Sequence, residues 1–543
     1  MKIVISDKNL ILLLCLVFCT FNSLKAQQGM WTWMKGDSTY CSNGIFGVQG
    51  VPDSLNTPPG LYEACEWTDL NGDFWLYGGA NLCGCRYYSV LWKYTVSSNV
   101  WTWIMGDSAL NFSEPNYGMI GLPSPTNTPG FRGYGTLTWV DKNGNLWLFG
   151  GTTSNGRYAD LWKYNTDINM WTWVSGSSQL NAPGYFGIKG VASTFNYPQA
   201  RYETSASWTD HDNNLWLFGG ARTKGLGNDL WKYNISENTW TWVTGDSAVD
   251  SQGNYGIMGI ASATNEPPAR CAYSKWNGKD DNLWFMGGSG FGLYNDLWKY
   301  DIASTMWSWV NGPNVVYDTG NYGELCDPLG NNYPPARFEN RACWTDNNGN
   351  FWMFGGFREG SDFCFNDMWC YNPQSNQWRW VNGNDTLNNV GIYGTIGVPS
   401  INNIPRARGG ALPFKDKFGN LWLFGGFIFI TPNIYVTSND LWRYVPDTSC
   451  SFNNSVQSFS ASQTQLYILP NPNNGIFKIK IDGIIFKEAY CYIFDVLGRK
   501  IFFDNFSNSN SEQIDISNQT NGVYYILVNI NGQQYKNKII VNK

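Results

Sequence analysis

The sequence predicts an all-β chain: a six-bladed β-propeller closed by an N-terminal strand and followed by a small C-terminal β-sandwich. Three observations support this prediction. The 29 tryptophans of the 543 residues fall into five columns that repeat six times, with one vacancy. Two adjacent glycines follow the second column in every repeat. Aromatic residues make up 17% of the chain and charged residues 14%, which suits short strands and tight turns better than helices.

Each repeat contains four short apolar segments separated by turn residues. In the third repeat these are marked by Trp208, by Trp216 with Gly219-Gly220, by Asn228 to Tyr233, and by the pair Trp240 and Trp242. Four such segments in sequence predict a four-stranded antiparallel blade. Trp31-Thr32-Trp33 is a fourth segment without its first three, and the last repeat ends at Tyr444 without a fourth. We therefore expect the N-terminal strand to complete the last blade and close the ring.

These units resemble the repeats of the kelch family, in which a strand ends in Gly-Gly and aromatic residues mark the third and fourth strands. The resemblance covers residues 30–445. It differs in length, because the units have about 70 residues against the ~50 of kelch repeats. The surplus is an insertion of about 25 residues between the Trp-x-Trp pair and the next first strand. Because strands alternate in direction, we expect the insertions and the loops after Gly-Gly to share one face, the predicted working surface.

The ends of the chain indicate export. Lys2 and Lys8, the apolar run from Leu10 to Phe21 and a small residue at Ala26 predict a signal peptide over residues 1–26. No later segment reaches the ~18 apolar residues that a transmembrane helix needs. The propeller is predicted over residues 27–445 and a Ser-, Asn- and Gln-rich linker over 446–465. A β-sandwich is predicted over 466–543.

The tail resembles the type A C-terminal sorting domain of the type IX secretion system of Bacteroidetes-like bacteria. The matching residues are Pro470, Asn471, Pro472 and Gly475 at its start and the turn residues Asp495, Gly498 and Arg499. The resemblance implies that the type IX machinery is a partner. It also implies passage through the periplasm and across the outer membrane, to a secreted or cell-surface location.

Composition excludes several classes of function. The formal net charge of −6 argues against nucleic acid, which is bound through clustered Lys and Arg. The only histidine is His211, in a polar turn, and no Cys-x-x-Cys or His-x-His spacing is present. We therefore expect no metal and no cofactor.

Eleven cysteines remain after the predicted signal peptide, in a compartment where disulfides form. Equivalent positions in the repeats predict a Cys326–Cys364 bond and a bond from Cys41 to Cys83 or Cys85. The alternative is that these cysteines are buried and reduced.

Candidate ligand residues lie at the starts of the first strands and in the insertions. The first group comprises Arg132, Arg201, Arg270, Arg337 and Arg408, with Gly60 in the corresponding place of the first repeat, and Glu203 and Glu339 two positions after their arginines. The second group comprises Tyr117, Tyr255, Tyr322 and Tyr393. Guanidinium groups around a channel could hold an acidic sugar. Alternatively, the arginines tie blades together and the tyrosines serve packing.

We therefore expect an exported or cell-surface binding or adhesion protein whose loop face engages a glycan or a protein, without catalytic residues. One alternative is a propeller enzyme, an epimerase or lyase, acting on acidic sugars at the central channel with Glu203 or Glu339 as acid or base. Another is a structural part of the cell-surface machinery.

Overall fold

The computed structural model describes residues 29–109, 112–203, 206–327, 331–358, 362–431, 434–446, 450, 465–482, 488–495, 499–507, 511–530 and 533–543. The predicted signal peptide lies outside these residues, as does most of the predicted linker. The chain divides into two compact units, Met1–Asn453 and Asn454–Lys543. All named elements of the described residues are β-strands, so the prediction of an all-β chain is confirmed.

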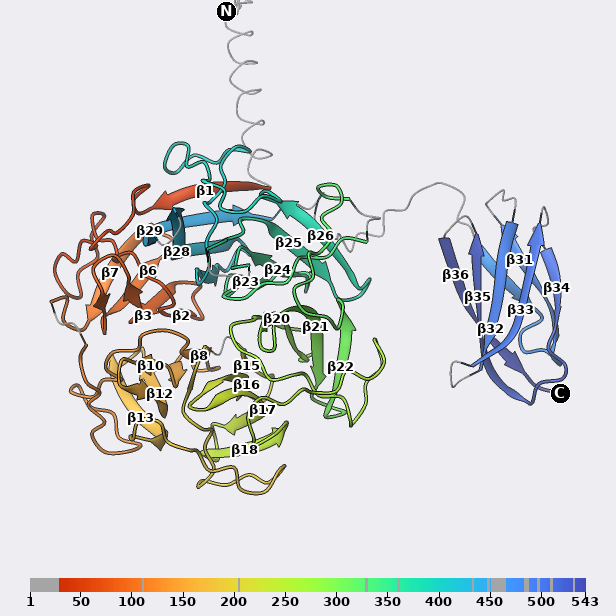
Figure 1. Ribbon diagram of the computed structural model, residues 1–543, viewed down its shortest axis with the longest axis horizontal. Coiled ribbons are helices and arrows are strands. Elements are labelled where there is room, and N and C mark those ends of the chain that lie inside the picture. Colours follow the sequence, from red (N-terminus) through yellow and green to blue (C-terminus); the bar gives the residue numbers. More distant parts are fainter. Residues whose placement is uncertain are drawn as a thin grey trace, which may run out of the picture. The chain divides into compact units, whose positions relative to one another are not determined.

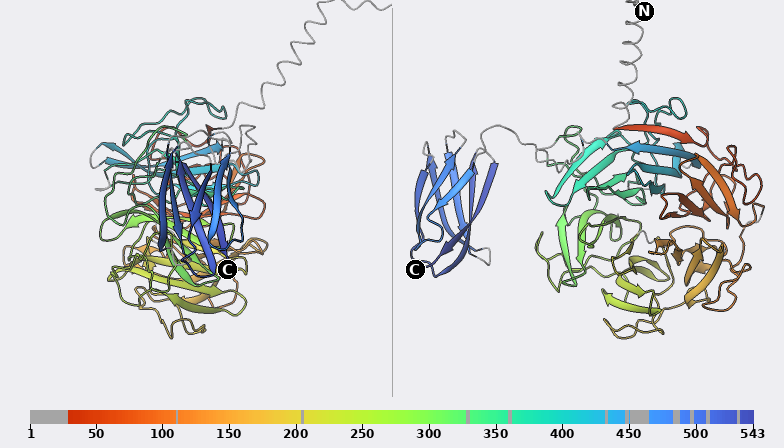
Figure 2. Two further views of the ribbon diagram at one scale, coloured as in Figure 1. Left: turned by 90° about the vertical axis from the view of Figure 1, so that its right-hand side faces the viewer. Right: turned by 180° about the vertical axis from the view of Figure 1, so that it is seen from behind.

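In the first unit, antiparallel sheets are arranged around a common centre (Figures 1 and 2). We number them in chain order. Sheet 1 contains β2 (Cys65–Thr68), β3 (Phe74–Tyr77), β6 (Leu91–Thr95) and β7 (Val100–Met105). Sheet 2 contains β8 (Leu137–Val140), β9 (Leu146–Phe149), β12 (Ala159–Asn165) and β13 (Met170–Ser177). Sheet 3 contains β15 (Ser207–Thr209), β16 (Asn214–Arg222), β17 (Gly225–Asn234) and β18 (Thr239–Thr244), with the short β14 (Arg201–Tyr202) beside β16.

The remaining sheets of this unit repeat the pattern. Sheet 4 contains β19 (Ser274–Asn277), β20 (Leu283–Ser289), β21 (Leu293–Asp301) and β22 (Met306–Asn311). Sheet 5 contains β23 (Cys343–Thr345), β24 (Phe351–Phe354), β25 (Met368–Asn372) and β26 (Gln377–Asn382). Sheet 6 contains β27 (Leu412–Lys415), β28 (Leu421–Thr431), β29 (Ile434–Val445) and β1 (Met30–Lys35). Two small ribbons pair β4 (Ala80–Asn81) with β5 (Arg86–Tyr87) and β10 (Thr152–Thr153) with β11 (Gly156–Arg157).

The N-terminal strand closes the ring as the sequence predicts. β1 pairs antiparallel with β29, with Met30 opposite Val445 and Trp33 opposite Trp442. Sheet 6 therefore combines the first described strand of the chain with the last three strands of the unit. This arrangement leaves no cut edge between the first and last repeats.

The apolar core lies between neighbouring sheets rather than within one layer. Residues of sheets 1 and 2 form one buried cluster, as do those of sheets 2 and 3, and so on around the ring to sheets 6 and 1. The tryptophan columns supply these clusters and also join the sheets by hydrogen bonds. The Trp67 indole N–H donates to the carbonyl of Trp147, and the Trp139 indole to that of Trp216, both at 2.9 Å.

The double glycines bring neighbouring sheets close together. Gly355 and Gly356 have φ values of 70° and 98°, a region that favours glycine. The Gly356 N–H donates to the carbonyl of Arg408 in the next repeat at 2.9 Å. A Cβ on Gly355 would lie 2.6 Å from the same carbonyl oxygen. The glycine pair thus allows the next sheet to approach without a steric clash.

Each insertion packs along the outer strand of the sheet that follows it. The Gly121 N–H donates to the carbonyl of Trp173 at 2.8 Å, and the Asn127 side chain to that of Trp171 at 3.0 Å. Near its start the same insertion contacts the loop after Gly-Gly through Ser113 and Ser89. The insertions therefore begin on the expected face, but most of their length forms the outer rim of the propeller.

The second unit is a sandwich of two sheets. One contains β30 (Gln465–Leu469), β31 (Ile476–Asp482) and β34 (Ser511–Asp515). The other contains β33 (Lys500–Ser507), β32 (Glu488–Phe494), β35 (Gly522–Ile530) and β36 (Gln533–Val541). Its core consists of alternating inward residues such as Phe477, Ile493, Ile514 and Ile526.

Candidate functional site

The five predicted arginines are enclosed within the sheets. Their exposed fractions are 0–1%. Each forms a bidentate ion pair with an aspartate on, or in sheet 5 directly before, the third strand of its own sheet: Arg132 with Asp160, Arg201 with Asp229, Arg270 with Asp296, Arg337 with Asp367 and Arg408 with Asp440.

Arg132 illustrates how completely these side chains are occupied. Its guanidinium donates twice to the carbonyl of Pro129, once to that of Gly150 and once to each oxygen of Asp160, at 2.7–3.1 Å. An arginine has five N–H donors, so none is left for a ligand. Each of these arginines thus holds a buried carboxylate of the protein, which favours the alternative that they stabilise the fold over the prediction that they bind an acidic ligand.

The four insertion tyrosines belong to the same clusters. Their hydroxyls donate to the paired aspartates at 2.6–2.8 Å: Tyr117 to Asp160, Tyr255 to Asp296, Tyr322 to Asp367 and Tyr393 to Asp440. Burial and the neighbouring carboxylate raise the pKa of all four phenols. Ring and hydroxyl thus fasten the insertion to the sheet, which favours the packing alternative over the prediction that these tyrosines contact a ligand.

In two insertions phenylalanine replaces the tyrosine, and in the sheets that follow them the partners of the aspartate or the ion pair itself also change. In sheet 3, Phe186 cannot donate to Asp229, and a second guanidinium, that of Arg222, pairs with this carboxylate instead. In sheet 1, Phe46 packs on Trp92, and Leu61 and Val90 take the places of arginine and aspartate. Leu61 is the residue equivalent to the arginines, since its carbonyl accepts a hydrogen bond from the Gly426 N–H just as the carbonyl of Arg408 accepts one from the Gly356 N–H. The assignment of this place to Gly60 is wrong by one residue.

The structure brings the two predicted glutamates together at the centre of the ring and adds a third. Glu63, Glu203 and Glu339 come from sheets 1, 3 and 5, and their carboxyl oxygens lie within 4.8 Å of one another. Their φ values are 47°, 52° and 52°, which is uncommon outside glycine. Backbone bonds link this level of the ring: Gly410 donates to Glu339 at 2.8 Å, Glu339 to Ala272 at 2.9 Å and Ala272 to Glu203 at 2.8 Å.

The surroundings of these carboxyls favour their protonated form. Burial, reinforced by the neighbouring carboxyls, raises the pKa of Glu63 and Glu339 well above the usual range. The same causes raise the pKa of Glu203 to about 7. Among the described residues, Arg341 forms the ion pair with this cluster: its Nη1 lies 3.7 Å from Glu63, while its Nη2 donates to Glu66 at 2.8 Å.

The glutamate cluster is almost closed to ligands. Glu63 is 2% and Glu339 5% exposed, while Glu203 is partly exposed. The rings of Tyr62 and Phe427 pack together beside it, with centroids 5.5 Å apart, and Tyr62 lies close enough to Glu339 to share a hydrogen bond. Three carboxyls offer oxygen ligands that suit a hard cation such as Ca²⁺. The guanidinium of Arg341 opposes such a cation, and the raised pKa values favour protons in its place.

Glu63, Tyr62 and Arg341 are site residues that the sequence reasoning missed. A signal for Glu63 exists, since an aromatic-Glu pair recurs at the same level in alternate repeats, as Tyr62-Glu63, Tyr202-Glu203 and Phe338-Glu339. The pattern is not evident when positions are aligned on the first-column tryptophan. The segment from Leu61 to Trp67 is one residue shorter than the equivalent segment from Arg132 to Trp139.

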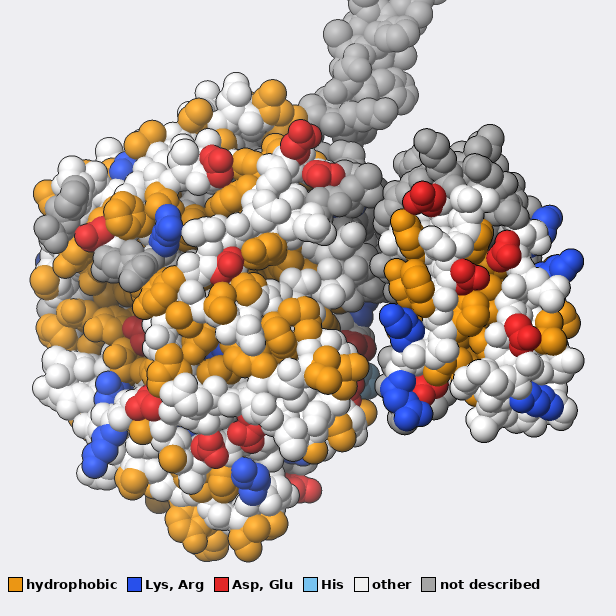
Figure 3. Space-filling model, turned by 45° about the vertical axis from the view of Figure 1, so that its right-hand side comes forward, with side chains coloured by type: hydrophobic (Ala, Val, Ile, Leu, Met, Phe, Trp, Pro, Cys, Tyr) orange, Lys and Arg blue, Asp and Glu red, His pale blue; other side chains and the backbone are white. Residues whose placement is uncertain are grey.

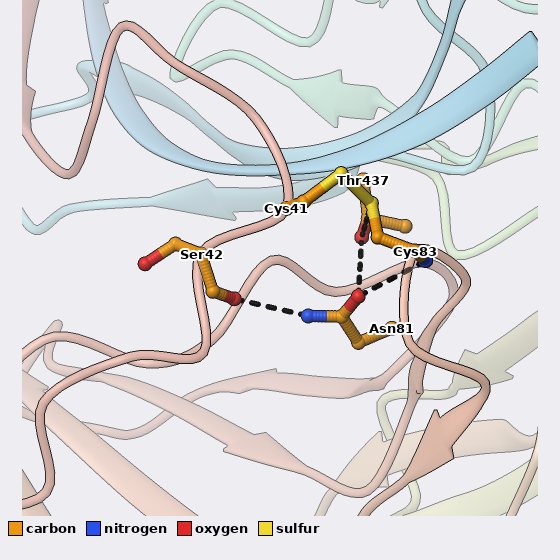
Figure 4. The surroundings of a disulfide bond; sticks show 5 residues. All are labelled: Cys41, Ser42, Asn81, Cys83 and Thr437. Atoms are coloured by element: carbon orange, nitrogen blue, oxygen red, sulfur yellow. Dashed lines mark hydrogen bonds between the residues drawn. A yellow bond between two sulfur atoms is a disulfide. The ribbon is translucent and has the colours of Figure 1, made fainter.

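The structure contains two disulfides among its described residues. Cys41 is bonded to Cys83 rather than Cys85, which is one of the predicted pairs. Figure 4 shows Asn81 beside it, donating to the carbonyl of Ser42 at 2.9 Å and accepting from Thr437 of β29 at 3.3 Å. The predicted Cys326–Cys364 bond is wrong. Cys326 is bonded to Cys450, which follows β29, and Cys364 is buried with a free thiol.

The motif residues of the tail connect strands of the second unit. The Asn471 side chain donates to the carbonyl of Lys538 at 2.7 Å and accepts from Ile540 at 2.8 Å. Pro470 and Pro472 follow cis peptide bonds on either side of Asn471. Asp495 accepts from the backbone and side chain of Arg499 and so closes the turn between β32 and β33. Gly498 lies outside the described residues.

Both units contain a segment that matches a known protein family. Residues 122–323 match the KLHDC2/KLHL20/DRC7 Kelch-repeats domain, and residues 467–542 match the secretion system C-terminal sorting domain. A curated relative is the leucine-zipper-like transcriptional regulator 1 homolog of Drosophila melanogaster, which is 21% identical over 275 residues. That alignment covers 44% of this chain and 25% of the relative, so the chain matches about a quarter of the relative's length. No helix within the described ranges is long and apolar enough to cross a membrane.

Proposed function

We propose that this chain, with its kelch repeats and its secretion sorting domain, is an exported or cell-surface binding protein whose propeller rim engages a protein ligand. The sorting domain then directs export by the type IX machinery. A binding role fits a fold in which repeated loops present a large surface on a rigid scaffold.

The supporting observation is a set of apolar side chains that recur in exposed positions of the insertions. Two residues after the insertion aromatic, Val48, Met119, Ile188 and Ile257 are 67–72% exposed. Three positions further on, Val51, Leu122, Val191, Ile260 and Val398 are 49–56% exposed. Exposed apolar groups gathered on one surface mark sites of protein interaction. Charged side chains are sparse on the face of the propeller in Figure 3, where hydrophobic side chains recur.

A glycan is the second candidate ligand, because the insertion before sheet 3 also has a groove. A cavity of about 570 Å³ lies among Tyr185, Ile188, Val191, Phe195 and Tyr197. Tyr185 is 57% and Phe195 78% exposed. Aromatic side chains of this kind offer flat apolar faces with, in tyrosine, a polar edge. The enzyme alternative has less support, because the arginines on which it depended are paired with aspartates of the protein.

Two experiments test the proposal on the full chain. A photoreactive residue in place of Ile188 should cross-link a discrete surface protein on the producing cells, whereas the same residue at Phe418, an exposed aromatic of a hairpin turn, should not. Equal cross-linking from both positions would contradict a rim site. On an array of neutral and acidic glycans, binding that disappears in the Tyr185→Ser/Phe195→Ser variant but persists in Phe418→Ser would instead establish the glycan ligand.

A further inference from the structure

One layer of the central channel differs from every repeated column of the propeller. It consists of the residues immediately before the first-column aromatic: Glu66, Thr138, Ser207, Lys275, Cys343 and Pro413. All six are different amino acids, whereas the position that follows is tryptophan in five of the six sheets. Structural positions of a repeat tend to be repeated, while a binding site needs unlike groups that converge on one point. The variety of this layer is therefore typical of a binding site.

A cavity of about 330 Å³ opens on this layer between the first strands of sheets 2 to 5. Its polar lining consists chiefly of Thr138, Ser207, Thr209, Lys275, Asn277 and Thr345. The volume lies at the lower end of the range of small-molecule sites.

The walls of this cavity are fixed by bonds between neighbouring first strands. Thr209 donates to the carbonyl of Val140 at 3.1 Å, and Asn277 to that of Thr209 at 3.0 Å. Thr345 donates in turn to the carbonyl of Asn277 at 3.1 Å. Each sheet is thus tied to the one before it at the mouth of the channel, and the cavity is formed before any ligand binds.

Among the described residues that line the cavity, Lys275 is the only charged one. Its Nζ donates to Ser207 Oγ, and the Ser207 hydroxyl is itself committed to the carbonyl of Thr138 at 2.9 Å. An ammonium has three N–H donors. Only one of them has a partner among the described residues, so two remain for a ligand.

The charges nearby leave this ammonium without a carboxylate of its own. Glu66 acts on it electrostatically, but the guanidinium of Arg341 binds Glu66 at 2.8 Å. A second ammonium, that of Lys415, lies at the same end of the channel and donates to the carbonyl of Thr345 at 2.7 Å. Asp346 and Asp416 act on Lys415, while both accept hydrogen bonds within their own turns. Burial lowers the pKa of Lys275 to about 8, which indicates that its charge is poorly compensated.

We propose that this cavity binds a small organic anion, a carboxylate or phosphate borne by a molecule of monosaccharide size, with the ammonium of Lys275 as its charge partner. The hydroxyl and amide oxygens of the wall provide acceptors for the neutral part of the ligand. The site lies in the channel and is independent of the rim surface, so either can exist without the other.

The test uses the full chain and three probes of similar size: D-glucuronate, D-glucose 6-phosphate and D-glucose. An anionic probe should protect Lys275 from reductive methylation, as read by mass spectrometry, whereas glucose should not. Whichever anion protects identifies the carboxylate or the phosphate as the preferred group. Equal labelling of Lys275 with and without both anions would overturn the proposal, whatever the variants do.

Calorimetry on matched variants provides the second measurement. Lys275→Met should weaken binding of the protective anion by about tenfold or more, as expected for the loss of a charged hydrogen bond. Lys232→Met, which removes a lysine packed over Trp216 on another strand, should bind as the unmodified chain does. Wild-type affinity should fall above pH 8, where Lys275 loses its proton. Unchanged affinity in Lys275→Met would refute the assignment; if this variant does not fold, the protection experiment decides alone.

Discussion

Arg337 and Asp367 form a fully buried bidentate ion pair, with Nη1–Oδ1 and Nη2–Oδ2 distances both of 2.7 Å. The same pair occurs in sheets 2 to 6 and is replaced in sheet 1 by the apolar residues Leu61 and Val90. Removing one member of a buried pair leaves a bare charge, whereas apolar replacement of both can be nearly neutral.

We therefore expect Arg337→Leu and Asp367→Val, each alone, to lower the free energy of unfolding by about 3–5 kcal/mol. The double variant, which copies sheet 1, should be more stable than either single variant. Adding Tyr322→Phe should restore more, because the Tyr322 hydroxyl then no longer needs the lost carboxylate. Urea unfolding gives the free energy of unfolding of all four variants. If the loss in the double variant equalled the sum of the two single losses, the two residues would not stabilise the fold as a pair.

The glutamate cluster predicts that stability falls as pH rises above about 4.5. A carboxyl whose pKa is raised in the folded state binds its proton more tightly there than in the unfolded chain. Its stabilising contribution is complete below the unfolded pKa and is lost as pH rises through the folded value, about 7 for Glu203. Each such group contributes a slope of about 1.4 kcal/mol per pH unit within that window.

Glu203→Gln tests this relation, because glutamine resembles the protonated carboxyl and does not titrate. Relative to the unmodified chain, the variant should gain stability steadily between pH 4.5 and 7 in urea unfolding. Glu237→Gln, on an exposed turn, provides the control and should give a constant difference. Parallel curves for Glu203→Gln and the unmodified chain would show that folding does not raise the pKa of Glu203.

The Cys326–Cys450 disulfide spans 124 residues and the Cys41–Cys83 disulfide 42. Closing loops of this length stabilises a chain by about 4–5 kcal/mol in the chain-entropy model. Cys450→Ser should therefore lower the free energy of unfolding by this order, and Cys364→Ser, which removes a free thiol, should not change the disulfide pattern. Non-reducing peptide mapping that finds Cys326 joined to Cys364 would contradict the structure.

Gly475 should be essential to the sorting domain. Its φ is 99°, and a Cβ would lie 2.6 Å from Cα of Ser517. Gly475→Ala should therefore destabilise this unit and lower the amount of the chain that reaches the culture medium or cell surface. Gly522→Ala is the matched control, because a Cβ there meets only the Tyr524 ring, at 3.9 Å. Equal export of both variants would show that Gly475 is not required for sorting.

The repeat made the fold predictable because the tryptophan columns are set by cross-strand pairing. Trp208 lies directly opposite Trp216, as Trp276 does opposite Trp284, so a spacing of eight residues corresponds to one hairpin. The residues of the site were harder to place. The sequence does not show directly which residue pairs with each arginine. One signal exists: the first repeat has Leu61 at the arginine position and Val90 at the aspartate position, and this joint replacement indicates that the two positions form an ion pair.

Other parts could not be derived from the sequence, for physical reasons. Cys450 follows the last strand of the propeller, where composition predicts only a linker, and its proximity to Cys326 depends on how sheets 5 and 6 pack. Lys275 is one of several lysines, and only the closed ring places it beside Ser207 of the preceding sheet. Side chains of different sheets meet at the centre of the ring only once the sheets are packed, so their proximity cannot be derived from spacing along the chain.

The pairing of β1 with β29 also constrains when the propeller can fold. Residues 30–35 leave the ribosome, and enter any export channel, long before residues 434–445. Until that last strand arrives, the opening strand has no partner and the ring has a gap between its first and last sheets. Contacts so distant in sequence form slowly. The order of synthesis thus withholds the finished propeller until the whole repeat region has emerged.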